Sequence, residues 1–321
     1  MTSFPLYHGL LALIIIFSLS STSNAYDIAP VTDEMRASAS AIISSFLPST
    51  GVTKSSSSVW QRLAYITDTY GPRFSGSDSL ENVLDHIRDT ATTDELVVTE
   101  MEAFLPRWVR GVEYGSWTTN TRTKKLHLVG LGMSNTTGGI NGGGVEISAP
   151  GIVISGSSPA EAYSNLLANC SLVQGKIVVF NVPFTTYGGT VGVRSSAGTW
   201  GAQCGAVAAI IRTIGAYSLQ NPHTGATDQT APIASAAVSI EDAEQMQRMQ
   251  DRGTPFTLTL FMNSTWLPDR PSRNILIDVL GSENPGEVVA IGGHVDSWDI
   301  AEGAMGKFLN YQIIKRRPVF L

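Results

Sequence analysis

Apolar residues at helical spacing predict a helical N-terminal third of the chain. One helix is expected over residues 59–70, where apolar side chains recur every three or four residues. The pair Gly71-Pro72 follows, and glycine then proline is typical of a helix end. A second helix is expected from about Ser79, with His86 on its polar, solvated side. A weaker helix is expected over 35–46.

Farther along, the pattern changes to short strands and capped helices. Strands are expected at 96–99, 126–129, 176–180, 256–262, 273–279 and 287–293. Serine caps predict helices over 159–167 and 240–251, and a helix running into a strand is expected over 201–211. The apolar run Val288 to Ile291 is typical of a central strand covered on both faces. Residues 120–265 are expected to form a self-contained inserted domain.

The first 25 residues are typical of a removable signal peptide. The apolar run over 10–19 is too short to span a bilayer, and Ser23-Asn24-Ala25 suits signal peptidase. Cleavage is expected between Ala25 and Tyr26, although no Lys or Arg precedes the run, and a signal anchor is the alternative. Residues 26–54 are interpreted as a pro-segment or linker. No further membrane span is expected after removal of the signal.

Composition narrows the classes of function. The chain has 321 residues with a formal net charge of −6, which gives no footprint for nucleic-acid binding. Two cysteines exclude a disulfide scaffold and a four-cysteine zinc site; Cys170 and Cys204 form either one disulfide or two buried thiols. Sequons at Asn135, Asn169 and Asn263 are candidate glycosylation sites in a secretory compartment.

Candidate chemistry gathers at His294. A histidine at the carboxyl end of a central strand projects into the crevice where open α/β sheets bind ligands. Asp296, two residues on, can fix the imidazole tautomer as it does for metal-bound histidines. A purely structural His–Asp hydrogen bond is the alternative. The chain has no H-E-x-x-H motif and no G-x-S-x-G motif.

Four sequence stretches together resemble the M28 aminopeptidase and glutamate carboxypeptidase family. VVAIGGHVDSWDIAEGAM is similar to the first zinc-binding motif of that family, and YGPRFSGS to an N-terminal motif. NPHTGATDQT and SIEDAEQMQRM are similar to the protease-associated domain inserted in one branch. The resemblance covers about residues 55–305. It implies an α/β zinc-exopeptidase-type mixed sheet interrupted by a protease-associated domain.

The resemblance also implies a function. Members are secreted or lysosomal dizinc exopeptidases that act on dipeptides and short peptides, usually as homodimers. His294 matches a zinc ligand and Asp296 the residue that orients it. The implied organisation is a peptidase domain beginning at 55–119, a protease-associated domain at 120–265, the start of the zinc-peptidase core at 266–305, and a tail at 306–321 outside the family pattern.

The match stops after Met305. The bridging aspartate, the general-base glutamate and the remaining ligands of the family have no counterpart here, and the tail carries four basic and no acidic residues. A frame shift, retained intron or splice variant is the interpretation. Asp299 and Glu302 are the remaining candidate ligands beside His294, so this chain is expected neither to hold two zinc ions nor to hydrolyse peptides. The alternatives are a non-catalytic secreted binding module and a gene product without a stable fold.

Overall fold

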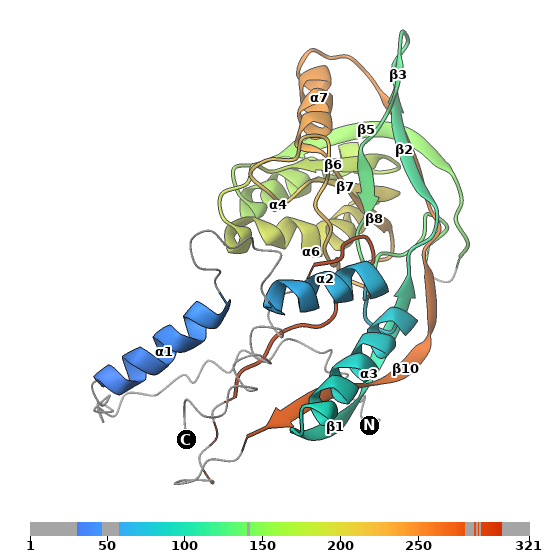
Figure 1. The fold of residues 1–321 in the computed structure, drawn as a ribbon. Helices are drawn as coiled ribbons and strands as arrows, with labels where there is room; N and C mark the ends of the chain where they lie inside the picture. Colours follow the sequence, from blue (N-terminus) through green and yellow to red (C-terminus); the bar gives the residue numbers. More distant parts are fainter. Residues whose placement is uncertain are drawn as a thin grey trace, which may run out of the picture.

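The computed structural model describes residues 31–46, 58–139, 142–279, 286, 288 and 290–303. They form an eight-stranded mixed sheet with helices and a separate two-stranded ribbon (Figure 1). The expected α/β class is confirmed. Among these residues no helix has both the length and the apolar character needed to cross a membrane. The signal peptide, its cleavage site and the tail at 306–321 lie outside the described residues.

The elements alternate along the chain. The helices are α1 (Asp33–Phe46), α2 (Ser58–Tyr70), α3 (Asp78–Thr93), α4 (Pro159–Ala168), α5 (Cys170–Val173), α6 (Tyr187–Gln203) and α7 (Ile240–Asp251). The strands are β1 (Val97–Val109), β2 (Glu113–Thr118), β3 (Thr123–Lys125), β4 (Leu128–Gly130), β5 (Ile147–Ser155), β6 (Ile177–Asn181), β7 (Ala208–Arg212), β8 (Ala234–Val238), β9 (Thr257–Met262) and β10 (Thr265–Asp278).

The eight-stranded sheet is a unit of its own. Its strand order is β3-β2-β9-β5-β6-β7-β8-β4, with β5 to β8 parallel and the other neighbours antiparallel. All eight strands come from residues 113–262. The inserted domain is expected over 120–265, and the sheet also includes β2, which ends at Thr118 and pairs with both β3 and β9.

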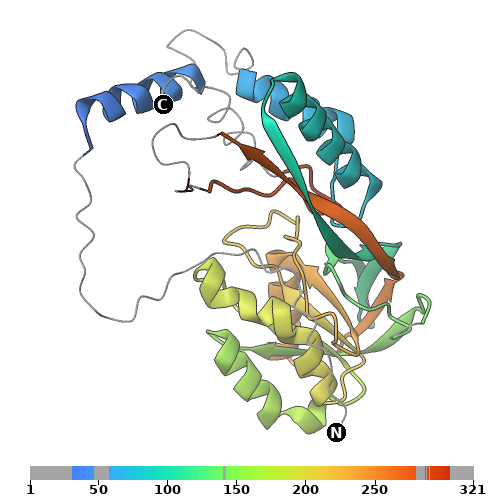
Figure 2. The ribbon, with the colours of Figure 1, turned by 90° about the horizontal axis from the view of Figure 1, so that it is seen from below.

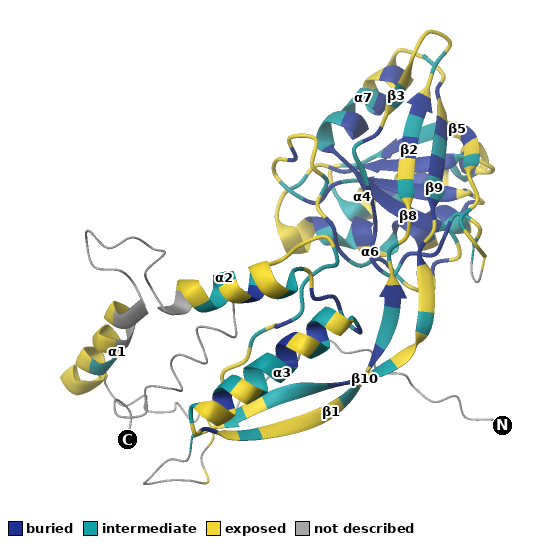
Figure 3. Ribbon diagram, turned by 45° about the vertical axis from the view of Figure 1, so that its right-hand side comes forward, coloured by how far each residue is buried: buried dark blue, intermediate teal, exposed yellow. Residues whose placement is uncertain are grey.

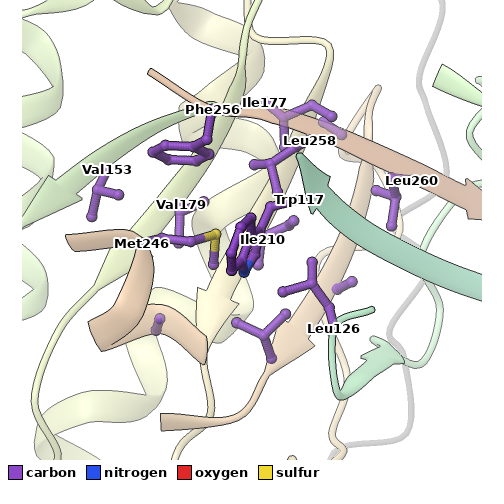
Figure 4. Packing of buried hydrophobic residues seen from close by; sticks show 14 of the residues in the cluster. Trp117, Leu126, Val153, Ile177, Val179, Ile210, Met246, Phe256, Leu258 and Leu260 are labelled. Carbon is purple, nitrogen blue, oxygen red and sulfur yellow. The ribbon is translucent and has the colours of Figure 1, made fainter. Parts of the chain in front are cut away.

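Each face of this sheet has its own core. Every residue of β6 is buried, as parallel strands covered on both faces require. On one face Ile177 and Val179 pack with Met246 of α7 and with Trp117 of β2 (Figure 4). On the other face Val178 joins a cluster with residues of α4 and α6. Alternate side chains of one strand thus enter opposite cores.

The ribbon of β1 and β10 extends beyond this unit (Figure 2). Helix α3 lies against it, and a small core joins Leu84 of α3 to Ile66 of α2, Leu105 of β1 and Val295. Helix α1 lies apart from the other described elements, with mostly exposed side chains (Figure 3).

Several expected elements have the predicted bounds. The capped helix over 240–251 is confirmed, with Ser239 Oγ accepting a hydrogen bond from the Asp242 amide at 3.1 Å. Helix α2 ends at Tyr70, and Gly71 adopts a φ of +59°, the left-handed conformation that closes helices. Because these signals are local, the sequence alone reveals them.

Two expectations about single segments are wrong. His86 is half-buried, and its ring lies 5.0 Å from that of Tyr65 and 5.9 Å from that of Tyr70. The described residues of the strand expected at 287–293, which are 288 and 290–293, carry no strand structure, and the side chain of Val288 is 85% exposed. Strands β1 and β10 pair only with each other, so no third strand of the described chain holds this segment.

Cys170 and Cys204 form a disulfide bond, the first of the two alternatives for these residues. It connects α5 to the C-terminal cap of α6 within the eight-stranded unit. No described cysteine remains free.

Candidate active site

The segment that carries His294 is a loop, and its backbone is held by an arginine far away in the sequence. Arg73, which is 1% exposed, lies after α2. Its guanidinium donates from Nε to the Val295 carbonyl at 3.0 Å and from Nη2 to the Glu302 carbonyl at 3.0 Å. The amide of Arg73 donates to Ser297 Oγ, and the amide of Ser297 donates to the Arg73 carbonyl, both at 2.9 Å. One buried cation therefore fixes residues 295–303.

Burial also affects the pKa of the Arg73 guanidinium. Desolvation lowers the pKa of Arg73, and the carboxylates of Glu302 and Asp296 act in the opposite direction. The guanidinium remains charged at neutral pH, since arginine is effectively always protonated in proteins. Arg73 thus supplies a fixed positive charge beneath the loop that carries Asp296.

His294 and Asp296 adopt the geometry expected from the sequence. His294 Nδ1 lies 2.8 Å from Asp296 Oδ1. Their side chains are 68% and 42% exposed, whereas Val295 between them is buried in the small core. A carboxylate on Nδ1 holds the proton on that nitrogen, which leaves Nε2 as the nitrogen available to a metal or substrate.

Asp299 does not lie free beside His294. Its two carboxylate oxygens accept hydrogen bonds from Arg110, at 2.6 Å from Nε and at 3.1 Å from Nη2. The side chain of Asp299 is 19% exposed and that of Arg110 is 11% exposed. Asp299, a candidate ligand by its position in the sequence, is therefore occupied by an ion pair.

An aromatic cluster lies next to this ion pair. The ring of Trp298 stacks on that of Phe74 with centroids 5.2 Å apart, and Phe74 meets Trp108 edge-on at 6.0 Å. Trp298 also packs on Gly132, where an added Cβ atom would come within 2.3 Å of the ring. Phe74 follows Arg73, so one short segment supplies both the buried cation and the stacking ring.

The described residues do not fit a two-zinc centre. A catalytic zinc ion needs about three protein ligands of the nitrogen, sulfur or carboxylate type. His294 offers one imidazole nitrogen, and Asp299 is paired with Arg110. In the ranges that the structure describes, no group of three or more His, Cys, Asp or Glu side chains is arranged to hold a metal ion.

Sequence reasoning missed the arginines that support the site. The motif YGPRFSGS carries the family resemblance in the sequence, and that resemblance assigns no role to Arg73. Arg110 carried no signal at all, because its partner Asp299 is 189 residues away. An arginine inside the motif was the one available signal.

The three sequons differ in accessibility. Asn135 is 6% exposed, and its Nδ2 donates to the Ala231 carbonyl at 2.5 Å, so this fold leaves no room for a glycan there. This is contrary to the expectation from the sequence. Asn169 is half-buried, and its Nδ2 donates to the Asn165 carbonyl at 2.8 Å. Asn263 is exposed, and its Oδ1 accepts from the Gly144 amide at 2.8 Å.

Comparison with known proteins identifies the relatives of this chain. Carboxypeptidase Q of Xenopus laevis is 36% identical over 264 residues, which is 79% of this chain and 54% of that protein. The enzyme of Homo sapiens is 34% identical over 263 residues, covering 79% and 53%. The chain is similar to carboxypeptidase Q. It spans about half the length of the curated relatives that it matches.

Solved structures agree with this similarity to carboxypeptidase Q. A peptidase M28 precursor from Shewanella amazonensis SB2B superposes with a TM-score of 0.70 at 25% identity, covering 83% of this chain and 58% of that one. An aminopeptidase from Aneurinibacillus sp. strain AM-1 shares the fold, with a TM-score of 0.50 at 13% identity, covering 70% and 48%. No protein-family profile matches the sequence. The expected resemblance to M28 peptidases is confirmed.

Proposed function

We propose that this chain is a metallo-exopeptidase of carboxypeptidase Q type, a type of enzyme whose substrates are dipeptides and short peptides. The observation that carries the proposal is the imidazole of His294, exposed and bonded at Nδ1 to Asp296, on a loop held by the buried Arg73. An exposed imidazole that is hydrogen-bonded to a carboxylate at Nδ1 is oriented to bind a metal ion through Nε2. The similarity to carboxypeptidase Q supports the same interpretation.

By itself, the 321-residue chain is proposed neither to hold two zinc ions nor to hydrolyse peptides. Asp299 already neutralises Arg110, so recruiting it to a metal would leave a mostly buried guanidinium with one fewer partner. Glu302 is exposed, and the Arg73 contact engages its backbone carbonyl. One imidazole with one exposed carboxylate binds zinc weakly.

The test combines elemental analysis with a dipeptidase assay on the purified 321-residue protein. The expected result is fewer than two zinc ions per chain and no turnover. Weak zinc binding should fall further in His294→Ala and should persist in His223→Ala, a matched exposed histidine. Two zinc ions per chain with turnover that His294→Ala abolishes would contradict the proposed inactivity.

The compartment is proposed to be the secretory route, ending outside the cell or in the lysosome. The disulfide between Cys170 and Cys204 suits an oxidising compartment, and the exposed sequon at Asn263 suits glycosylation there. A homodimer is part of the same proposal, by analogy with the family. Fractionation of cells that express the tagged chain, followed by size determination, tests both points.

The second candidate is a non-catalytic secreted binding module. Residues 113–262 favour it, because they form a complete sheet with a core on each face and a disulfide. By the family resemblance this unit is the protease-associated domain. If partner capture by this chain is unchanged in His294→Ala and Asp296→Asn, the module is favoured over the peptidase.

A further inference from the structure

We infer that Arg110 and Asp299 are positioning residues, which set the orientation of the His294 imidazole by tying its loop to the eight-stranded sheet. The inference rests on the proposed function in that it assumes a role for His294. It concerns how this chain prepares that side chain, and no metal takes part in it.

The guanidinium of Arg110 is a junction of four contacts. It binds both oxygens of Asp299. Its Nη1 donates to Glu113 Oε2 at 3.0 Å and to the Gly130 carbonyl at 2.5 Å. It also lies 5.1 Å from the centroid of the Trp108 ring. A planar fork with five donors suits such a site, and an ammonium group would not reproduce it.

These partners belong to different parts of the fold. Glu113 begins β2 and Gly130 ends β4, so both belong to the eight-stranded sheet. Trp108 lies in β1 of the ribbon, and Asp299 lies in the loop. Arg110 therefore connects sheet, ribbon and loop at one point.

The loop depends on such anchors because its backbone is irregular. Residues 290–298 form neither helix nor strand, so no ladder of backbone hydrogen bonds fixes the direction of His294. Arg73 holds the backbone at Val295 and at residues 302 and 303, and the ion pair holds the side chain of Asp299 between them. The contacts of Arg73 tie the loop to the segment after α2, and the ion pair adds a tie from the loop to the eight-stranded sheet through Arg110.

A packing contact of the Trp298 ring supports the ion pair between Arg110 and Asp299. The Trp298 ring packs on Gly132, whose amide donates to the Gly225 carbonyl at 2.9 Å; its carbonyl accepts from the Thr227 amide at 3.0 Å. Gly225 and Thr227 lie in the long connection between β7 and β8. The eight-stranded unit thus contacts the loop through Trp298 as well as through Asp299.

Charge supports the same assignment. Burial lowers the pKa of Arg110, but hydrogen bonds to Asp299 and Glu113 raise it by more, so the net shift is upward. Two carboxylates around one guanidinium leave neither the cation nor Asp299 uncompensated. Removing either partner leaves a poorly hydrated charge between the loop and the eight-stranded sheet.

The experiment measures the tautomer of the His294 imidazole. Histidine is labelled with ¹⁵N, and two-bond ¹H–¹⁵N spectra of the metal-free 321-residue protein are recorded at a pH at which the imidazole is neutral. His294→Ala identifies the signal, and Asp296→Asn removes the carboxylate that holds the Nδ1 proton. The wild-type signal is expected to show the Nδ1–H tautomer.

Asp299→Asn and Arg110→Gln are expected to lose this signature while the melting of the eight-stranded unit stays cooperative. Arg110→Lys keeps the charge but not the planar fork, so it is expected to lose the signature as well, and it serves if Arg110→Gln does not fold. The matched control is Asp78→Asn, which breaks an exposed ion pair with Arg270 on the ribbon and should leave the signature intact. Folded Asp299→Asn with an unchanged His294 tautomer would overturn the inference. The spectra need neither zinc nor substrate, so failure of the peptidase proposal gives a separate result.

Discussion

The ring of Trp298 lies directly against Gly132, with no space between them for a side chain. The contact joins the loop of His294 to the end of the β4 segment, and the stacking of Trp298 on Phe74 extends it to the segment after α2. Packed aromatic contacts of this kind determine where a loop without regular secondary structure lies. Three parts of the sequence, around residues 74, 132 and 298, therefore meet at one place.

Gly132→Ala is expected to displace Trp298. The new Cβ would lie 2.3 Å from ring atom Cζ3, and overpacking of this kind costs about 1–3 kcal/mol of unfolding free energy. Urea unfolding measures the loss, and hydrogen exchange of the Ser297 amide reports the movement of the loop. Gly188→Ala, at an exposed helical position with open space around the new methyl group, is the control and should be neutral or slightly stabilising. Unchanged Ser297 exchange in Gly132→Ala would contradict the prediction.

Arg73→Met is expected to release the loop from its first anchor. Methionine retains much of the apolar volume but removes the donors to the carbonyls of Val295, Glu302 and Gly303. Leaving the buried Val295 carbonyl without a donor costs about 1–3 kcal/mol. Limited proteolysis of the loop and urea unfolding are the measurements. Arg36→Met on the exposed helix α1 should change neither, and equal effects of both substitutions would refute a specific role for Arg73.

The fold predicts a sharp boundary for the eight-stranded unit. A fragment of residues 111–264 is expected to fold alone, because it contains every strand of the eight-stranded sheet and the core on each of its faces. A fragment of residues 120–264 lacks β2 and with it Trp117, which is 2% exposed in one core (Figure 4). That shorter fragment should leave β9 as an exposed edge and aggregate. Thermal melting of the two fragments decides between the boundaries, and cooperative melting of the shorter one would reject this placement.

How far the sequence predicts the fold depends on the range of the interactions. The helix over 240–251 was predictable because its cap, Ser239, lies next to the residues it caps. The helix expected from Ser79 begins at Asp78, since Ser77 Oγ accepts from the Leu80 amide at 3.1 Å. Errors of one or two residues are usual at helix ends. Local side-chain chemistry thus decides these elements.

The missed features depend on partners distant in the sequence. The apolar run at 288–291 has the composition of a strand, but strand structure also needs a hydrogen-bonded neighbour, and the described chain supplies none. The pairing of His294 with Asp296 was predictable at a separation of two residues. The contacts of Arg73 with Val295 and of Arg110 with Asp299 span 222 and 189 residues, and no local pattern encodes them.

The half-buried imidazole of His86 predicts a stability change near pH 6.5. Burial beside Tyr65 and Tyr70 lowers its pKa, Arg62 lowers it further, and Asp89 opposes the shift. The unfolded chain, with an ordinary pKa near 6.5, therefore binds more protons than the folded chain between the lowered pKa and 6.5. Stability should fall as the pH drops through this window and recover above it. Melting temperatures of wild type and His86→Phe from pH 5 to 8 test this.

The melting temperature should change less steeply with pH in His86→Phe than in the wild type. His223→Phe, at an exposed position, serves as the control and should keep the wild-type slope. Identical slopes for wild type and His86→Phe would show that another group carries the pH dependence.

Asn263 is expected to carry a glycan when the chain is expressed in a secretory pathway, and Asn135 is not. The side chain of Asn263 is exposed and accepts a hydrogen bond from the Gly144 amide through Oδ1, which leaves Nδ2 for modification. The Nδ2 of Asn135 is buried and bonded to the Ala231 carbonyl, so a glycan there would prevent this packing. Asn263→Gln should remove a glycosidase-sensitive shift in gel mobility, and Asn135→Gln should leave that shift unchanged. The two substitutions should also differ in stability, because Asn135→Gln disturbs a buried hydrogen bond and Asn263→Gln changes a surface residue. A mobility shift lost in Asn135→Gln but retained in Asn263→Gln would reverse the assignment.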